Sequence, residues 1–202
     1  LNMNSHVQLV IKNKKSGYGI ATYSKFQIVN KGVLKFENTS NACIYSDIKV
    51  YDDTIRVYNC HLQSLRLKER NLNFLIKQDH QGESNTVDEL KDISFKFRDA
   101  LIKRAIQVNM ITAHVKTCKY PVIICGDFND SPFSYTYHEL TRNLNDTFKE
   151  TGKGLANTYV RFFPYRIDYI LHSNEIKATN FSSPRVDYSD HYPVIGTYSM
   201  NN

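Results

Sequence analysis

The sequence predicts a single domain of the α/β class, and three observations predict it. Residues 121–125, Pro-Val-Ile-Ile-Cys, form a continuous apolar run that is typical of a strand buried on both faces. Residues 42–50 and 54–61 carry strand-like apolar runs on either side of a polar turn, which indicates a hairpin. Between residues 88 and 117 apolar side chains recur at steps of three and four, which indicates a long helix. Because strands and helices interleave without a linker rich in Gly or Pro, we expect residues 1–202 to form one domain.

The first third of the chain is predicted to be mostly strand. Strands are expected at residues 7–11, 19–24 and 28–36, with a turn at residues 13–17. Within the third of these strands, Asn30-Lys31-Gly32 predicts a bulge or a turn. The hairpin that follows is expected to turn at Tyr51-Asp52-Asp53.

Helices, a loop and further strands are predicted beyond the hairpin. A first helix is indicated by the spacing of Leu65, Leu72, Leu75 and Ile76. Residues 78–87 are polar and predict a loop. A short helix is expected at residues 136–144, and the remaining strands at residues 155–160, 167–171 and 194–199.

Composition and charge are those of a globular protein with an excess of basic residues. The chain has 202 residues, 41% hydrophobic and 23% charged, which is enough for a sizeable core. Its net charge of +6 would favour a polyanionic partner such as nucleic acid or an anionic lipid surface, although many basic proteins bind neither. Five basic residues of the long helix lie largely off its apolar stripe, and we interpret them as a solvated face, with a nucleic-acid track as the alternative: Lys96, Arg98, Lys103, Arg104 and Lys116.

The cysteines and the apolar runs argue against several classes of protein. Cys43, Cys60, Cys118 and Cys125 show no Cys-x-x-Cys spacing, so we expect neither a zinc site nor a disulfide. No apolar stretch reaches the roughly 18 residues that a membrane span needs. Residues 1–6 have neither the charge nor the apolar block of a signal peptide.

Asp127 and Asn129 are the first pair of candidate functional residues. They follow the buried strand at residues 121–125, in the segment Gly-Asp-Phe-Asn-Asp. Residues i and i+2 of an extended chain point the same way, so the carboxylate and the amide should emerge together. The ends of central strands are where α/β proteins tend to bind ligands, but Asp and Asn also favour ordinary turns.

Asp168 lies inside a predicted strand, between Ile167 and Ile170. A carboxylate in such a place costs several kcal/mol unless it is paired or bound to a cation. Arg166 points the same way in an extended chain, so an ion pair between Arg166 and Asp168 is the structural alternative.

Two histidines complete the set of polar candidates. His191 follows Asp190 at a corner before the last strand, and His61 ends the second strand of the hairpin. Taken singly, each is a typical structural imidazole. In the company of Asp127 and Asp168, His191 is a candidate base or phosphate ligand.

In their order and context these segments resemble the endonuclease/exonuclease/phosphatase superfamily, the DNase I-like metal-dependent phosphoesterases. The resemblance extends from about residue 17 to residue 198, and five segments carry it: residues 19–25, 57–63 (Val-Tyr-Asn-Cys-His-Leu-Gln), 123–129 (Ile-Ile-Cys-Gly-Asp-Phe-Asn), 166–171 (Arg-Ile-Asp-Tyr-Ile-Leu) and 189–194 (Ser-Asp-His-Tyr-Pro-Val). The resemblance implies two β-sheets packed face to face with helices outside, a four-layer sandwich. It also implies hydrolysis of a phosphate ester, a phosphodiester rather than a monoester.

The resemblance further implies a role for each candidate residue. Asp127 would orient or activate the attacking water, and Asn129 would hydrogen-bond the scissile phosphate. Asp190 would help to hold a divalent cation, Mg²⁺ with Mn²⁺ as the alternative.

The imidazoles receive their implied roles in the same way. Asp168 would accept a hydrogen bond from His191, which would contact the phosphate or act as the general base. His61 would donate to a phosphate oxygen or protonate the leaving group. Hydrolysis needs an in-line water, charge neutralisation at the phosphoryl oxygens and help for the leaving group, and this set of residue types supplies those functions.

One departure from the family pattern affects the expected metal site. Family members begin with a strand that carries an Asn and a strand that ends in Gln-Glu, whose Glu is the main metal ligand. Glu37 is the first glutamate here and lies in another segment. We therefore expect that the N-terminal strands are lacking, that these residues alone bind Mg²⁺ weakly and hydrolyse poorly, and that exposed sheet edges promote self-association.

The substrate is left open by the sequence. The superfamily includes nucleases, sphingomyelinases and inositol-polyphosphate phosphatases, so nucleic acid, a phospholipid or an inositol phosphate are all expected partners. His61 disfavours the abasic-site endonucleases, which usually have Tyr at this place. The sequence of residues 59–64 around His61 most resembles bacterial members of the superfamily, some of which are tethered by an N-terminal membrane segment. A non-catalytic relative that serves as a binding module is the alternative function.

Overall fold

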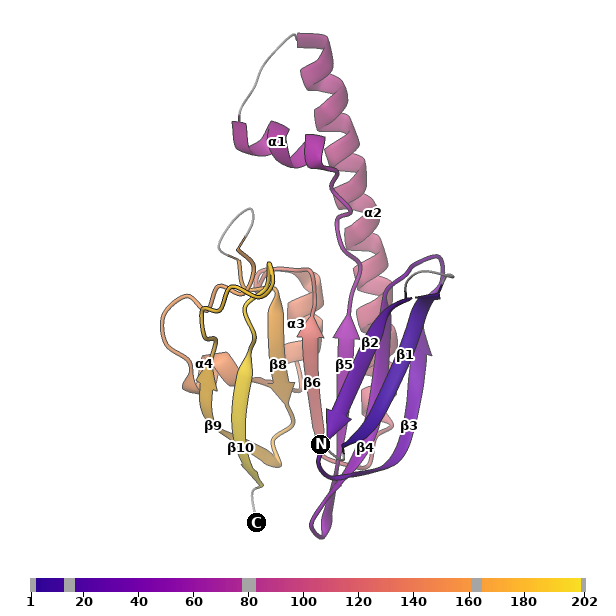
Figure 1. The fold of residues 1–202 in the computed structure, drawn as a ribbon, viewed down its shortest axis with the longest axis vertical. Coiled ribbons are helices and arrows are strands. Elements are labelled where there is room, and N and C mark those ends of the chain that lie inside the picture. Colours follow the sequence, from indigo (N-terminus) through magenta and orange to yellow (C-terminus); the bar gives the residue numbers. More distant parts are fainter. Residues whose placement is uncertain (1–2, 13–16, 78–82, 161–164, 201–202) are drawn as a thin grey trace.

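The computed structural model describes residues 3–12, 17–77, 83–160 and 165–200. It contains ten strands and four helices (Figure 1). The strands are β1 (Asn4–Lys12), β2 (Gly17–Ser24), β3 (Gln27–Lys35), β4 (Ala42–Val50), β5 (Asp53–His61), β6 (Val122–Asp127), β7 (Asn145–Asp146), β8 (Asp168–His172), β9 (Ile176–Ser182) and β10 (Ile195–Met200). The helices are α1 (Glu69–Lys77), α2 (Glu83–Lys116), α3 (Tyr135–Thr141) and α4 (Thr147–Thr151).

The strands form one large sheet and two small ones. The large sheet has the order β3-β4-β5-β6-β8-β7, and β1-β2 and β9-β10 are separate two-stranded sheets. Neighbouring strands are antiparallel except for β5 and β6, which are parallel. The mixed α/β class that the sequence predicts is therefore confirmed.

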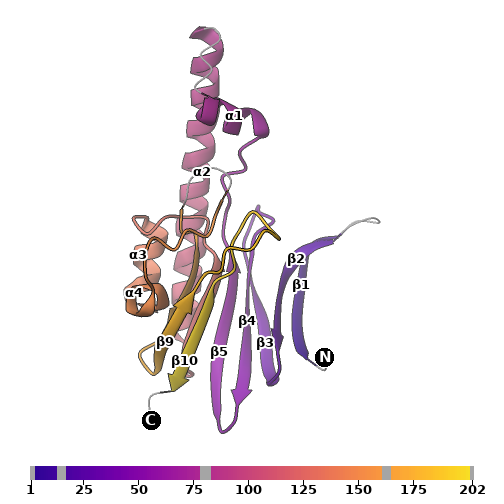
Figure 2. The ribbon, with the colours of Figure 1, turned by 60° about the vertical axis from the view of Figure 1, so that its left-hand side comes forward.

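The large sheet is covered by helices on one face and by the two small sheets on the other. Figure 2 shows α2 and the β1-β2 hairpin on opposite sides of the sheet. On the hairpin side, the Asn59 amide donates to the Ala21 carbonyl at 2.8 Å. Farther along the same face, the Tyr198 ring of β10 lies 5.6 Å from the His172 ring of β8. The layers are thus helix, large sheet and a layer made of two hairpins.

The main core lies between the large sheet and helices α2 and α3. Its fully buried members include Tyr58 and Ile124 from the strands and Val108 and Ile111 from α2. α2 is the longest helix, and its N-terminal part projects beyond the sheet together with α1 (Figure 1). In the described part of the chain, no helix is both long and apolar enough to cross a membrane.

Most of the expected strands are confirmed within a residue or two. The hairpin strand β4 has the expected bounds, and the register of β3 against β4 shifts between Ile28 and Asn30, where a bulge or turn was predicted. The expected strand at residues 167–171 is β8, and the one at residues 194–199 is β10.

Three local predictions are wrong. Residues 155–160 form no strand, and only Tyr159 makes isolated bridges, to Tyr165 and His191. The expected loop at residues 78–87 already contains the start of α2 at Glu83, while residues 78–82 lie outside the described residues. The sequence prediction also lacks β7 and α4, which are short, and the seven-residue strand β9.

Arg104 of α2 is not part of a solvated face, as the sequence had suggested. Its side chain is buried, donates to Asp130 at 2.9 Å, and also donates to the Gln63 carbonyl at 2.9 Å. Because Gln63 follows β5 and Asp130 follows β6, this guanidinium ties α2 to the loops at the end of two neighbouring strands. A buried cation needs such partners, and periodicity alone does not reveal them.

Candidate active site

Three polar side chains form a row across the end of the large sheet. His61 of β5 is the register partner of Asp127 of β6, and Asp127 is the partner of Asp168 of β8. Directly opposed residues point to the same face of a sheet, so the three side chains project together. The His61 Nε2 atom lies 3.8 Å from a carboxylate oxygen of Asp127. This face is the one that the two hairpins cover.

The backbone around Asp127 holds its carboxylate in place. Gly126 has φ of +133°, a conformation that residues with a side chain rarely adopt. Asn129 has φ of +52°, which Asn tolerates better than most residues, and its backbone N–H donates to Asp127 Oδ1 at 2.8 Å. The Asn129 side-chain amide donates to Asp127 Oδ2 at 2.9 Å and to the Leu62 carbonyl at 3.0 Å. The two residues therefore emerge together, as expected from their spacing.

His191 reaches the row from the loop before β10. Its Nδ1 atom lies 2.8 Å from Asp168 Oδ2, so the carboxylate orients the imidazole and leaves Nε2 free to act. The Asp168 backbone is held by Thr158, whose hydroxyl accepts from the Asp168 N–H at 3.1 Å. The Thr158 carbonyl in turn accepts from the Tyr192 N–H at 2.7 Å, which fixes the loop that carries His191.

The electrostatic surroundings shift the pKa values of this row in different directions. Burial, and then the charge of Asp168, raise the pKa of the Asp127 carboxyl to about 7. The hydrogen bond to Asp168 raises the pKa of His191, which favours its imidazolium form. Burial, and then the charge of His191, lower the pKa of His61. One imidazole thus has a raised pKa and the other a lowered one, and the carboxyl between them has a pKa of about 7. Such a set of groups can donate and accept protons, as acid–base chemistry requires.

The same residues fit a divalent cation. Ligand atoms of Asp127, Asp168 and His191 lie within 4.8 Å of one another, which makes two carboxylates and one imidazole available at a single point. Burial is the main cause of the raised pKa of Asp127 and the nearby charge of Asp168 is the second, and a bound cation would favour the ionised form of both carboxylates. Asp190 does not belong to this group of described residues, so its part in metal binding stays a prediction.

Tyr18 belongs to the site and has no signal in the sequence. Its hydroxyl lies 2.6 Å from His61 Nδ1, and the two rings meet edge to face with centroids 6.0 Å apart. Tyr18 comes from β2, so packing of the β1-β2 hairpin on the large sheet creates the contact. Only a structure identifies this residue, because 43 positions separate it from His61.

Arg166 does not pair with Asp168, which was the structural alternative for this carboxylate. Arg166 is buried and donates to Asp146 Oδ1 at 2.9 Å, and its other terminal nitrogen lies 2.7 Å from Asp146 Oδ2. Its guanidinium also packs against the rings of Phe148 and Tyr169, at 4.7 and 4.6 Å. Because the Arg166 guanidinium pairs with Asp146, the Asp168 carboxylate is available to bond with His191.

A sheet end that gathers carboxylates and imidazoles offers the groups that metal-assisted hydrolysis uses. A family model described as the endonuclease/exonuclease/phosphatase family matches residues 2–191. The chain belongs to this family, whose members are phosphoesterases that generally depend on a divalent metal. The match begins earlier than the resemblance in the sequence suggested and includes β1.

Solved structures show the same fold at low sequence identity. The catalytic domain of human nocturnin with a bound sulfate anion is 16% identical, with a TM-score of 0.65 over 98% of this chain and 73% of that one. The mannosyl-6-phosphatase Bt3783 from Bacteroides thetaiotaomicron is 19% identical, with a TM-score of 0.64 over 97% of this chain and 77% of that one. A family protein from Bacteroides vulgatus is 15% identical, with a TM-score of 0.68 over 98% and 77%. A comparison with curated protein sequences finds no match.

Proposed function

We propose that this protein hydrolyses phosphate esters, phosphodiesters in preference to monoesters, with Mg²⁺ as its cation and Mn²⁺ as the alternative. The convergence of His61, Asp127, Asp168 and His191 at one end of the sheet is the observation that carries the proposal. Mg²⁺ prefers oxygen ligands and retains several waters, so a site with few carboxylates can hold it. A bound cation would supply charge neutralisation at the phosphoryl oxygens.

Asp127 is the proposed base. Its carboxylate is held in position by Asn129 and would accept a proton from the attacking water. Both amide hydrogens of Asn129 are engaged, with Asp127 and with the Leu62 carbonyl. The proposed contact of Asn129 with the scissile phosphate therefore requires one of these bonds to open.

The two imidazoles act on opposite sides of the phosphate in this proposal. His191 is favoured as imidazolium by Asp168, so its free Nε2–H donates to a phosphoryl oxygen. His61, which ends β5 beside Asp127, donates to the phosphate or gives a proton to the departing oxygen. Asp190, next to His191 in the chain, is the proposed additional ligand of the cation.

The class of substrate is part of the proposal. Similar structures include a mannosyl-6-phosphatase from Bacteroides thetaiotaomicron and a truncated TDP2 from Caenorhabditis elegans. Nucleic acid suits the net charge of +6, and phospholipids and inositol phosphates offer the same phosphoryl group. A non-catalytic binding module is the second candidate, but a module has no need of His191 oriented by Asp168.

The proposal is tested by a substrate panel with the full chain. Plasmid DNA, bis-p-nitrophenyl phosphate, sphingomyelin and inositol phosphates are assayed with Mg²⁺, with Mn²⁺ and with EDTA. We expect at least one ester to be hydrolysed in Mg²⁺ and none in EDTA. Absence of any metal-dependent turnover across the panel would favour the binding module.

Variants separate this activity from a contaminant. Asp127→Ala should lower turnover by about 10²- to 10⁴-fold, because the positioned base is lost. Asp88→Ala removes the same charge from a side chain that is 81% exposed on α2, and should leave turnover unchanged. Asp190→Ala should raise the Mg²⁺ concentration needed for half-maximal activity, and an unchanged requirement would remove Asp190 from the proposed ligands.

A further inference from the structure

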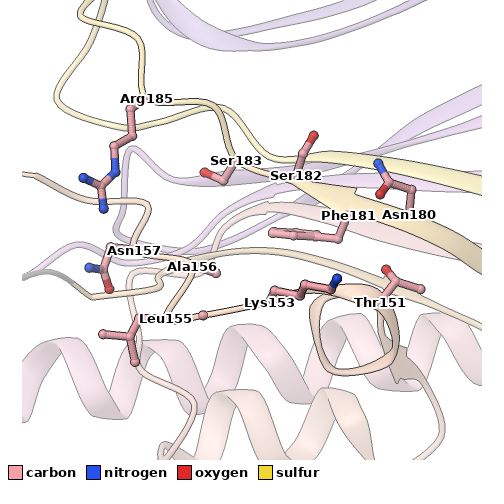
Figure 3. Close-up of a pocket in the computed structure, with 11 residues that line it drawn as sticks. Thr151, Lys153, Leu155, Ala156, Asn157, Asn180, Phe181, Ser182, Ser183 and Arg185 are labelled. Atoms are coloured by element: carbon pink, nitrogen blue, oxygen red, sulfur yellow. The ribbon is translucent and has the colours of Figure 1, made fainter.

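A cavity of about 540 Å³ lies beside the candidate active site and shares none of its proposed residues. One wall is the segment from Thr151, the last residue of α4, to Asn157, and the other is the end of β9 with the loop up to Arg185. Figure 3 shows side chains from these two segments facing each other. The volume lies in the range of about 300–1,000 Å³ that is usual for small-molecule sites.

The charged residues that line this cavity, among those described, are all basic. Among the described residues that line it are Lys153 and Arg185, and none is Asp or Glu. In Figure 3 the Arg185 guanidinium extends toward the Asn157 side chain, and Lys153 lies on the side of Thr151 and Asn180. Neither cation forms an ion pair within the described part of the chain. The cavity therefore presents uncompensated positive charge to whatever enters it.

Ser183 gives an independent indication of a ligand. Its hydroxyl oxygen is buried, and it is the one such side-chain atom among the described residues that lacks a hydrogen-bond partner. A buried polar group without a partner is costly, so native structures rarely retain one. Ser183 is one of the residues that line the cavity, and a rotation about its Cα–Cβ bond would let the oxygen of a ligand accept the hydroxyl hydrogen (Figure 3).

The cavity wall continues directly into the candidate active site. Asn157 precedes Thr158, whose hydroxyl accepts from the Asp168 N–H and whose carbonyl accepts from the Tyr192 N–H. The next residue, Tyr159, bridges to His191, with ring centroids 5.0 Å apart. An occupant of the cavity would thus touch the segment that fixes both Asp168 and His191.

We propose that this cavity is a second phosphate-binding site, distinct from the site of hydrolysis. The guanidinium of Arg185 offers a planar pair of donors that matches phosphate, and Lys153, which lies on the side of Thr151 and Asn180, adds a second positive charge to the cavity (Figure 3). Ser183 donates the remaining hydrogen bond, and Phe181 supplies an apolar wall for the group that carries the phosphate. Binding requires no hydrolysis, so this inference does not rest on the proposed function.

Direct titration tests the proposal. The full chain is titrated with inorganic phosphate while backbone amide shifts are followed by NMR, and affinity is measured by calorimetry. We expect the shifts to concentrate at Gly154 and Ser183 rather than at Gly126 and Asn129. Shifts confined to Gly126 and Asn129 would overturn the proposal.

A matched set of variants makes the test specific. Lys153→Gln combined with Arg185→Gln should weaken phosphate binding by about tenfold or more, since the charge-assisted contact of Arg185 and the second positive charge of the cavity are both removed. Lys177→Gln makes one Lys-to-Gln change at an exposed position of β9, outside the cavity, and should leave the affinity within about twofold of the original. If the double variant binds phosphate as tightly as the unmodified protein, the proposal is wrong.

A second arm identifies the source of the phosphate. A small bisphosphate ester that binds more tightly than inorganic phosphate, with the advantage lost in the double variant, identifies the cavity as a site for a phosphate carried by a larger molecule. Equal affinity of the two probes identifies it as a site for free phosphate. A protein that lacks hydrolytic activity but gives either result contradicts the proposed function and leaves this inference standing.

Discussion

Gly126 shows how a single residue determines the direction of the Asp127 side chain. A Cβ atom at position 126 would lie 2.0 Å from the carbonyl oxygen of Cys60, on the neighbouring strand β5. The φ of +133° is also strained for any residue with a side chain. Glycine is therefore required by close approach and by conformation together, at the position immediately before the proposed base.

Gly126→Ala should destabilise the protein by about 2–4 kcal/mol, because the backbone of β5 or β6 has to move. Urea denaturation measures the effect. Gly154→Ala is the control, since φ there is +77° but no atom lies within 4 Å of the added Cβ. Its cost should be limited to about 1–2 kcal/mol of backbone strain. An equal loss in the two variants would show that the contact with Cys60 is unimportant.

At the scale of elements, buried ionic and imidazole groups join segments that lie far apart in the chain. Asp146 caps the N-terminus of α4 by accepting from the Phe148 N–H, and it also binds Arg166. On the other side of the molecule, His114 of α2 lies 2.7 Å from the Tyr58 hydroxyl of β5. Each contact fixes a helix against the sheet.

Arg166→Met should destabilise the protein by about 3–5 kcal/mol, because it leaves the buried Asp146 carboxylate without its cation. Thermal or urea unfolding checks this value. Arg142→Met serves as the control, since that side chain is 68% exposed and its pair with Glu139 should contribute less than about 1 kcal/mol. Similar losses in both variants would contradict the structural role of the buried pair.

His114 should make the attachment of α2 dependent on pH. Burial, and then the charge of Arg56, lower its pKa below the ordinary 6.5, so folding disfavours its protonated form. Its contribution to stability is therefore fully present above pH 6.5 and is lost as the pH falls through the lowered pKa. His114→Gln should destabilise the protein most at pH 8, and the difference from the unmodified protein should shrink at pH 5.

Urea midpoints at several pH values test this dependence. The buried aliphatic substitution Ile111→Val on the same helix changes no titratable group, so its effect should stay constant over the same range. A His114→Gln difference that also stays constant between pH 8 and pH 5 would contradict the proposed linkage.

At the scale of the whole molecule, the layer opposite the helices consists of two separate hairpins. β1 pairs with β2, and β9 pairs with β10, and each of these four strands has one neighbour among the described strands. Backbone groups on the other edge of such strands are available to another chain. Self-association therefore stays a prediction, and the free edges of these four strands are the expected place of contact.

Sedimentation velocity over a range of protein concentrations tests self-association. Val7→Lys places a charge on β1, where the side chain is 51% exposed, and should weaken association because charges on an edge strand disfavour pairing. Tyr51→Lys, at the exposed turn between β4 and β5, should have no such effect. A single monomeric species at the highest concentration reached would contradict the prediction.

The sequence by itself determined the class of fold and the family, and it supplied the candidate residues of the proposed site other than Tyr18. Apolar periodicity located β4, β6 and most of α2, because burial imposes its period directly on the chain. Asp127, Asp168 and His191 were identifiable because carboxylates and imidazoles in or beside apolar strands are costly unless they serve a purpose. The untested part of that prediction is the role of each residue.

Only the tertiary structure decided which groups meet. The register of β5, β6 and β8 aligns His61, Asp127 and Asp168, and packing of a hairpin adds Tyr18. In the structure Arg166 also forms an ion pair with Asp146, and not with Asp168, which is its near neighbour in the sequence. The physical reason is that periodicity reports whether a side chain is buried, whereas its partner is chosen by the packing of segments that are remote along the chain.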